Sequence, residues 1–146
     1  MDGRLSAYGR GGTLRWQFST GGSPIESSPL VVDGWVYVGA WNGTLYAIDA
    51  ETGKADWTFA AAADIKGSAA LAGKLVVFAD YAGNVYAVDP ATGAQRWRYS
   101  GGQRFYGGPA ISGGTLVIGD VGGAVIALDT ATGRELWRHG TSGYVY

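Results

Sequence analysis

The sequence contains no cysteine and a single histidine, His139, among its 146 residues. The absence of cysteine excludes disulfide bonds, thiol nucleophiles and cysteine-ligated metals, and a lone imidazole excludes sites built from several histidines. The formal net charge is −1, so no excess of positive charge marks a surface for nucleic acid, and we expect none to bind. No apolar run approaches the roughly 18 residues of a membrane-spanning helix, and no apolar segment typical of a signal peptide follows Met1. We therefore expect no membrane insertion.

Glycine is the residue present in excess. The chain has 26 glycines, whereas average usage of about 7% would give roughly 10. The same chain carries 6 Trp, 9 Tyr and 4 Phe, which is far more aromatic surface than disordered chains contain. The combination indicates a folded protein with many tight turns.

A repeat of 40 residues runs through the chain. The pattern A-x-D-x-x-T-G-x-x-x-W occurs three times, beginning at Ala47, Ala87 and Ala127. Since a residue that recurs in every copy serves the fold, we assign a structural role to the repeated tryptophans, aspartates and glycines. These are Trp57, Trp97 and Trp137 with the earlier Trp16, then Asp49, Asp89 and Asp129, and finally Gly53, Gly93 and Gly133.

Each repeat divides into four short strands, which residues 28–32, 35–38, 44–48 and 54–59 represent in the first complete copy. Asn42-Gly43 between the second and third is a strong hairpin signal, because a type I′ turn needs positive φ at both positions. No segment shows the 3.6-residue apolar period of a helix. Four strands at a period near 40 predict an all-β fold, a β-propeller segment of four-stranded antiparallel blades.

We expect one propeller segment over residues 1–146, with three complete blades at about 27–60, 67–100 and 107–140. Residues 2–18 match only the last two strands of a preceding blade, and so form a half-blade at the N-terminus. Since a propeller needs about four or more blades to close, these units leave open blade edges through which the chain could self-associate.

This repeat resembles the pyrroloquinoline-quinone-type repeat of bacterial propellers, and the resemblance covers essentially the whole chain. The WD40 repeat has a similar period, but its Gly-His start and Trp-Asp end are absent. The resemblance implies a parent ring of seven or eight blades. It also implies that Trp16, Trp57, Trp97 and Trp137 dock between neighbouring blades. Family members usually work outside the cytoplasm, yet this chain shows no export signal of its own, so its compartment stays open.

Three classes of protein use this type of repeat. Quinoprotein dehydrogenases hold a quinone between a tryptophan and a disulfide of adjacent cysteines, beside a calcium ion. Scaffolds such as the BamB-type factor of outer-membrane assembly bind proteins without a cofactor, and other members are sensor domains of protein kinases. Because the chain has no cysteine pair, we expect no catalytic residues, metal or cofactor, and a protein-binding scaffold or sensor module. The alternative is a fragment of a quinoprotein dehydrogenase or a degenerate form of one.

Three further polar residues could belong to a site or to the fold. Asp80 and Asp120 stand where the first copy has Ala40. Each could accept hydrogen bonds from the adjacent backbone, which we favour, or from a ligand. His139 follows Trp137 at the position of Phe59 and Tyr99, which predicts a half-buried strand residue.

A partner would be bound by residues that differ between the copies. Antiparallel order places the connection between blades on the same rim as the turn between the second and third strands, opposite the Asp-x-x-x-Gly turns. Large aromatic side chains and arginine on such a rim are typical anchors of protein interfaces. The candidates for binding a protein partner are Trp41, Tyr81, Glu26, Lys66, Arg104, Phe105 and Tyr106.

Overall fold

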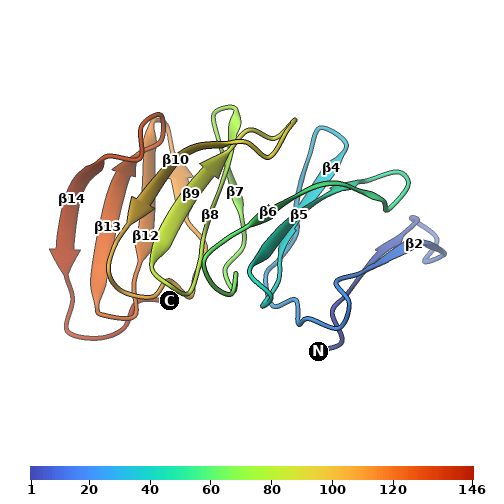
Figure 1. Ribbon diagram of the computed structural model, residues 1–146, viewed down its shortest axis with the longest axis horizontal. Coiled ribbons are helices and arrows are strands. Elements are labelled where there is room, and N and C mark those ends of the chain that lie inside the picture. Colours follow the sequence, from blue (N-terminus) through green and yellow to red (C-terminus); the bar gives the residue numbers. More distant parts are fainter.

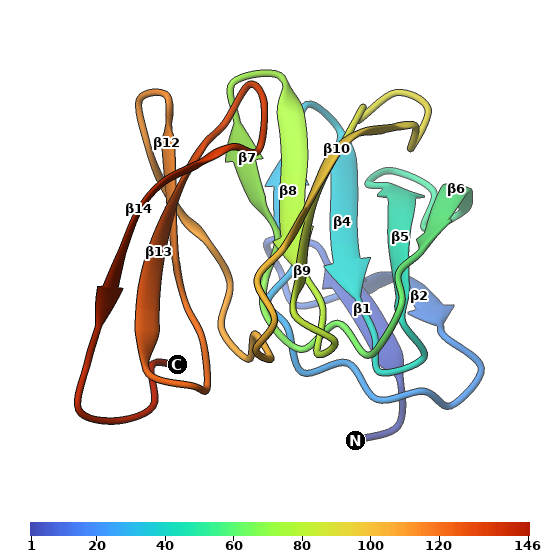
Figure 2. The ribbon, with the colours of Figure 1, turned by 60° about the vertical axis from the view of Figure 1, so that its left-hand side comes forward.

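A computed structural model describes all 146 residues, and its regular structure consists entirely of β-strands. The predicted all-β propeller segment is confirmed: three four-stranded antiparallel sheets, each formed by consecutive strands, follow a two-stranded sheet. Figures 1 and 2 show the sheets fanned side by side, with the two-stranded sheet at one end and β14 at the other. No helix of the structure is long and apolar enough to cross a membrane.

The strands have the following bounds. The half-blade consists of β1 (Arg4–Tyr8) and β2 (Leu14–Ser19). Blade 1 consists of β3 (Leu30–Val32), β4 (Trp35–Gly39), β5 (Thr44–Asp49) and β6 (Ala55–Ala60). Blade 2 consists of β7 (Ala70–Ala72), β8 (Leu75–Ala79), β9 (Asn84–Val88) and β10 (Gln95–Ser100). Blade 3 consists of β11 (Ala110–Ser112), β12 (Thr115–Gly119), β13 (Ala124–Asp129) and β14 (Glu135–Gly140).

The first strand of each blade is shorter than the sequence predicts. In blade 1 it begins at Leu30 instead of Ser28. The Ser28 N–H donates to Ser68 Oγ of the next blade, 2.8 Å away, and so does not join the ladder of its own sheet. The blades are close together here, because a Cβ added to Gly67 would lie 2.4 Å from the Gly107 backbone. This crowding explains why small residues begin the innermost strands.

The repeated Asp-x-x-x-Gly segment is a turn held by the aspartate. Asp49 Oδ1 accepts the N–H groups of Glu51 and Thr52 at 2.9 and 2.7 Å, and the Gly53 N–H donates to the Asp49 carbonyl. These bonds favour the ionised carboxylate, and the backbone bond from Thr52 is the main cause of a lowered Asp49 pKa. Asp89 and Asp129 form the same turn, in which their Oδ1 atoms accept the N–H groups of Ala91 and Ala131 at 2.9 Å.

The repeated tryptophans join neighbouring blades. The Trp16 Nε1–H donates to the Ala50 carbonyl at 2.9 Å, and a Cβ added to Gly53 would lie 2.6 Å from the indole ring. The indole therefore lies directly against the glycine, which also has a φ of +73°, and no other residue fits there without strain. The same joint recurs where Trp57 meets Pro90 and Gly93, and where Trp97 meets Thr130 and Gly133.

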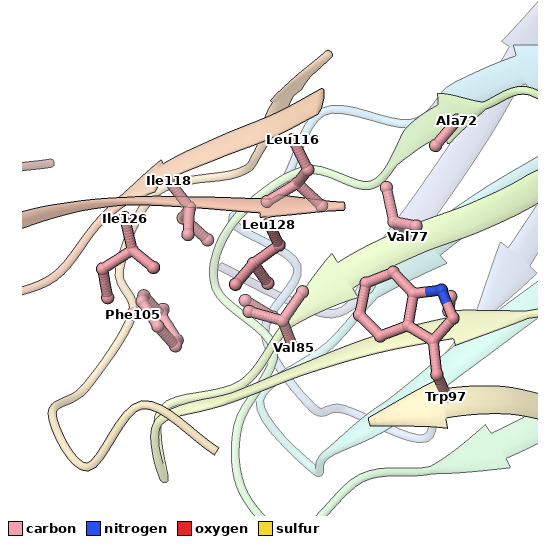
Figure 3. Close-up of a cluster of buried hydrophobic side chains, with 11 residues drawn as sticks. Ala72, Val77, Val85, Trp97, Phe105, Leu116, Ile118, Ile126 and Leu128 are labelled. Carbon is pink, nitrogen blue, oxygen red and sulfur yellow. The ribbon is translucent and has the colours of Figure 1, made fainter. Parts of the chain in front are cut away.

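The core lies between the blades. Figure 3 shows the cluster between blades 2 and 3, in which Trp97 packs near Val77, Val85 and Leu128. A second cluster between blades 1 and 2 contains Tyr37 and Phe78. Burial of apolar side chains across each junction provides the main stabilisation of the segment.

The outer face of blade 3 differs from the prediction. Trp137 is 48% exposed, and its indole donates no hydrogen bond. His139 is exposed instead of half-buried. The reason is that no sheet packs against this side of β13 and β14, whereas blade 3 covers the equivalent side of blade 2.

Candidate functional site

Backbone hydrogen bonds place the connection between blades against the turn of the blade that follows. The Trp41 N–H donates to the Pro24 carbonyl at 3.0 Å, and the Tyr81 N–H to the Asp64 carbonyl at 2.8 Å. The Val121 N–H donates to the Arg104 carbonyl in the same way. Residues of the connection and of the turn therefore share one rim, as the antiparallel order predicts.

Lys66 is the centre of an aromatic group on this rim. Its Nζ lies 3.6 Å from the centroid of the Trp41 ring, 4.9 Å from that of Tyr81 and 5.6 Å from that of Tyr106. An ammonium group over aromatic faces is attracted by their negative potential. Two rings from hairpin turns, Trp41 and Tyr81, and one from a connection between blades, Tyr106, thus lie around the Lys66 ammonium group.

Glu26 joins Trp41 of blade 1 to Tyr106, which lies in the connection that leads to blade 3. Its carboxylate accepts a hydrogen bond from Trp41 Nε1 at 3.2 Å and another from the Tyr106 hydroxyl. The bond to Glu26 favours the neutral phenol and raises the pKa of Tyr106. Residues 80 positions apart in the sequence are joined here, because the blades fan around a common axis.

Arg104 completes the set, with its guanidinium 5.1 Å from the centroid of the Tyr81 ring. Neither Lys66 nor Arg104 forms an ion pair with a carboxylate. We call this set the rim cluster: Glu26, Trp41, Lys66, Tyr81, Arg104 and Tyr106. The structure brings six of the seven predicted partner-binding residues into one surface that combines half-buried aromatic rings with two cations that form no ion pair.

A shallow pocket of about 290 Å³ adjoins the rim cluster. Besides Tyr81, Arg104 and Tyr106, its walls include Val121, Tyr144 and Tyr146. The rings of Tyr106 and Tyr146 lie 5.7 Å apart at nearly a right angle. Tyr144 and Tyr146 were not among the predicted residues. The 40-residue period carries a signal for Tyr146, which follows Glu26, Lys66 and Tyr106 in register.

Phe105 does not belong to this surface. It is only 1% exposed and packs in the core near Ile118 and Ile126, as Figure 3 shows. Its place in the period explains why: Ile65, one repeat earlier, is fully buried as well. The position is apolar in every copy, so Phe105 belongs to the core and cannot contact a partner.

Asp80 and Asp120 are both buried, but only one is fully bonded. Asp80 accepts hydrogen bonds from the backbone N–H groups of Ala62, Ala82 and Asn84, from the Asn84 amide and from the Tyr86 hydroxyl. It therefore closes its own hairpin, in agreement with the interpretation we favoured. Asp120 accepts the Ala124 N–H through Oδ1, while Oδ2 has no hydrogen-bond donor.

The opposite rim carries a larger depression of about 420 Å³ between blades 1 and 2. Trp35, Leu71 and Lys74 are among its lining residues, as are Tyr37 and Pro90, which are joined by a hydrogen bond from the Tyr37 hydroxyl to the Pro90 carbonyl. It contains none of the residues of the rim cluster. The two rims therefore present separate surfaces.

The residues present do not fit a quinone site of the kind that the resemblance implies. No three side chains among His, Asp and Glu come together to hold a metal ion, and the chain has no cysteine for the disulfide. We therefore derive no catalytic step through such a cofactor.

Comparison with known proteins supports one family throughout the chain. The family model described as "Outer membrane protein assembly factor BamB" matches residues 1–103 and 81–146. No curated protein sequence matches the chain.

Solved structures similar to this chain come from more than one class of protein. BamB from Moraxella catarrhalis is 29% identical, with a TM-score of 0.83, over 94% of this chain and 44% of that protein. Quinohemoprotein alcohol dehydrogenase from Comamonas testosteroni is 27% identical, with a TM-score of 0.73, over 82% of this chain and 21% of the enzyme. The computationally designed Ika8 protein is 21% identical, with a TM-score of 0.78, over 99% of this chain and 49% of the design, which shows the fold alone.

The chain thus spans less than half the length of the BamB structure and about a fifth of the dehydrogenase. The family match, which covers every residue, agrees with the blades and with the tryptophan–glycine joints between them. The chain belongs to the family of propellers described as outer membrane protein assembly factor BamB.

Proposed function

We propose that this chain is a non-enzymatic propeller module that binds a protein partner through the rim cluster. The observation that carries the proposal is the convergence of Trp41, Lys66, Tyr81 and Arg104 on one surface from different blades. Tryptophan, tyrosine and arginine are the residue types that dominate the binding energy of protein interfaces. A scaffold or a sensor domain would both use such a surface.

The charges of the rim cluster favour an acidic partner segment. Lys66 and Arg104 form no ion pair within the chain, while the carboxylate of Glu26 is already occupied by two donors. A partner carboxylate near Arg104 would gain a charge-assisted hydrogen bond. An aromatic or aliphatic side chain beside it would fill the pocket of Tyr81, Tyr106 and Tyr146.

The name of the matched family suggests the biological setting. Its relative from Moraxella catarrhalis is an outer membrane protein assembly factor by family description. We propose that the partner of this chain is a protein that takes part in the same process.

A photo-crosslinking experiment tests this proposal. A photoreactive amino acid replaces Tyr81 on the rim cluster or, as the matched control, Lys74 on the opposite rim, in cells that produce the protein. We expect adducts with one defined protein from position 81 and none from position 74, with the adduct identified by mass spectrometry. The charge variant Arg104→Glu, combined with the probe at position 81, should reduce the yield at least tenfold.

Equal yields from both rims, or a yield unaffected by Arg104→Glu, would show that the partner binds elsewhere. A dehydrogenase-like role is the second candidate, favoured by the similarity to the quinohemoprotein alcohol dehydrogenase. Titration of the chain with pyrroloquinoline quinone and Ca²⁺ tests it, and an unchanged absorbance spectrum together with an unchanged melting temperature would reject it.

A further inference from the structure

Each junction between blades is a joint with two halves. One half is an indole whose N–H needs a carbonyl acceptor, and the other is a glycine turn that offers this carbonyl and a flat surface. Three joints are closed within the chain, with donor-to-acceptor distances of 2.9 Å in every case. One tryptophan half and one glycine half have no counterpart within the chain, and they lie at opposite ends of the row of blades.

The open tryptophan half lies on blade 3. Trp137 is 48% exposed, whereas its equivalent Trp97 is 7% exposed. Val117 and Val125 beside it are only half-buried, although the equivalent Val77 and Val85 are fully buried. Blade 3 therefore exposes an apolar surface whose equivalent on blade 2 is buried in the core between blades 2 and 3.

The open glycine half lies on the half-blade. Gly12 has a φ of +80° and donates its N–H to the Gly9 carbonyl, as Gly53 donates to Asp49. A Cβ added to Gly12 would meet no atom within 4 Å, whereas in the three closed joints it would strike an indole. The carbonyl of Arg10, at the position of Ala50, accepts no hydrogen bond.

The side chain next to this turn is uncovered as well. Tyr8 occupies the strand position of Ile48, Val88 and Leu128. Those three residues are fully buried by the preceding blade, but Tyr8 is 62% exposed. The half-blade thus presents a preformed turn, a free carbonyl and an apolar contact, which are the three elements that a tryptophan requires at every other junction.

We propose that two copies of this chain associate head to tail, with Trp137 of each copy docked on the Gly12 turn of the other. The Trp137 indole donates to the Arg10 carbonyl, and Tyr8 packs against the face of Val117 and Val125. The contact pairs an indole, a carbonyl and a glycine as the internal junctions do, on a receiving turn that is one residue shorter, because it runs from Gly9 to Gly12 where the next one runs from Asp49 to Gly53. It is independent of the rim cluster, which lies at the edge of the blades and not on their open faces.

The dimensions of the relatives favour closure with two copies. One chain covers 44% of the BamB structure and 49% of the designed Ika8 protein, so two chains have about the length of one such protein. A head-to-tail contact repeats until the rotation per copy closes the ring. Two copies would form two joints, in each of which the two strands of a half-blade cover the outer strands of blade 3, β13 and β14.

Sedimentation velocity over a range of protein concentrations tests the proposal. We expect a dimer, of about twice the 15.2 kDa chain mass, that dissociates on dilution. Trp137→Ala removes the indole, and Gly12→Val places a side chain where the indole docks. Each should weaken association on the order of 30-fold or more, as the loss of a central aromatic anchor does.

Mixing the two variants provides the sharper result. In a mixed pair, the intact Trp137 of one copy can dock on the intact Gly12 of the other, so one of the two joints is restored. We expect Trp137→Ala and Gly12→Val to be monomers alone and to form a dimer together. If Gly12→Val fails to fold, as judged by circular dichroism, Tyr8→Glu replaces it, because Tyr8 is exposed in the single chain.

Three outcomes would overturn the proposal. The chain could remain a monomer at all concentrations, which would mean that something other than a second copy covers β14. It could form a dimer that withstands both substitutions, which would locate the contact elsewhere. Finally, mixing the two variants could leave both of them monomeric, although each is folded.

Discussion

Trp97 and Trp137 occupy equivalent positions in blades 2 and 3, and pair with equivalent alanines across the strand, yet their surroundings differ completely. Trp97 is almost fully buried, donates to the Thr130 carbonyl and lies on Gly133, whereas Trp137 has neither a carbonyl nor a glycine against it. The local strand geometry is thus a property of one blade, but the burial of its tryptophan is supplied by the next blade.

This difference teaches where the stability of a propeller lies. A blade fixes its own register through its hairpins, and each packing interface is shared between two blades. The same substitution should therefore have very different effects at covered and uncovered positions. Four predictions test this contrast between covered and uncovered positions, beginning with the largest expected loss of stability.

Removal of the two indoles gives the largest contrast. We expect Trp97→Ala to lower the free energy of unfolding by about 3–5 kcal/mol, because it leaves a cavity between blades 2 and 3. Trp137→Ala should cost less than about 1 kcal/mol under conditions where the chain is monomeric. Urea unfolding at low protein concentration measures both values, and similar losses would show that burial by the neighbouring blade is not what stabilises the tryptophan.

The glycines that receive the indoles sharpen the contrast. An added Cβ at Gly93 would lie 2.5 Å from the Trp57 ring, whereas at Gly73 it would meet nothing within 4 Å, although both residues have positive φ. We expect Gly93→Ala to cost about 2–3 kcal/mol, from overpacking as well as backbone strain. Gly73→Ala carries the strain alone and should cost about 1 kcal/mol. Equal melting temperatures for the two variants would contradict the role of contact with the indole.

The two buried aspartates differ in the same manner. Asp80 accepts five hydrogen-bond donors, and Asp80→Asn would place an amide N–H₂ group against some of them. We expect a loss of about 2 kcal/mol for this substitution. Asp120→Asn should cost less than about 1 kcal/mol, because Asp120 Oδ2 accepts no hydrogen bond and loses only a long ion pair, 3.8 Å from the partly exposed Arg138 guanidinium. Thermal unfolding of the two variants checks the order, and a larger loss for Asp120→Asn would reverse it.

Acid should weaken the turns of the three repeats together. The pKa values of Asp49, Asp89 and Asp129 are lowered in the folded chain, through backbone hydrogen bonds in Asp49 and Asp129 and mainly through Arg96 in Asp89. Since the folded pKa lies below the unfolded value of about 3.9, the stabilisation is complete above that pH and is lost as the pH falls through the folded pKa.

The melting temperature should accordingly fall with the pH below about 4. Asp129→Asn, which cannot be protonated, should make this decline less steep. A decline of the same slope in the variant would show that other carboxylates cause it.

Most of the fold could be predicted from the sequence because it is repeated. The period that relates Trp57, Trp97 and Trp137 restricts the architecture more strongly than any single strand propensity does. The period could not show whether a neighbouring blade covers a given residue, since the repeated residues are the same around Trp97 and around Trp137. The exposure of His139 was mispredicted for that reason.

The candidate site was predictable in membership but not in geometry. Differences between the copies identified Trp41, Lys66 and Arg104, yet the contact of Glu26 with Tyr106 spans 80 residues and depends on how the blades fan. Phe105 was assigned wrongly because a change from Ile65 to Phe105 was interpreted as variation, although both side chains are apolar and both are buried.

The joint between blades has a consequence for how such chains lengthen in evolution. From one closed joint to the next, each repeat carries one tryptophan that docks on the following blade and one glycine turn that receives the tryptophan of the preceding blade. Duplication of a DNA segment that encodes any whole number of repeats therefore adds as many receiving turns as docking indoles. A new copy inserted in register is compatible with both of its neighbours from the outset, wherever in the repeat the duplication begins.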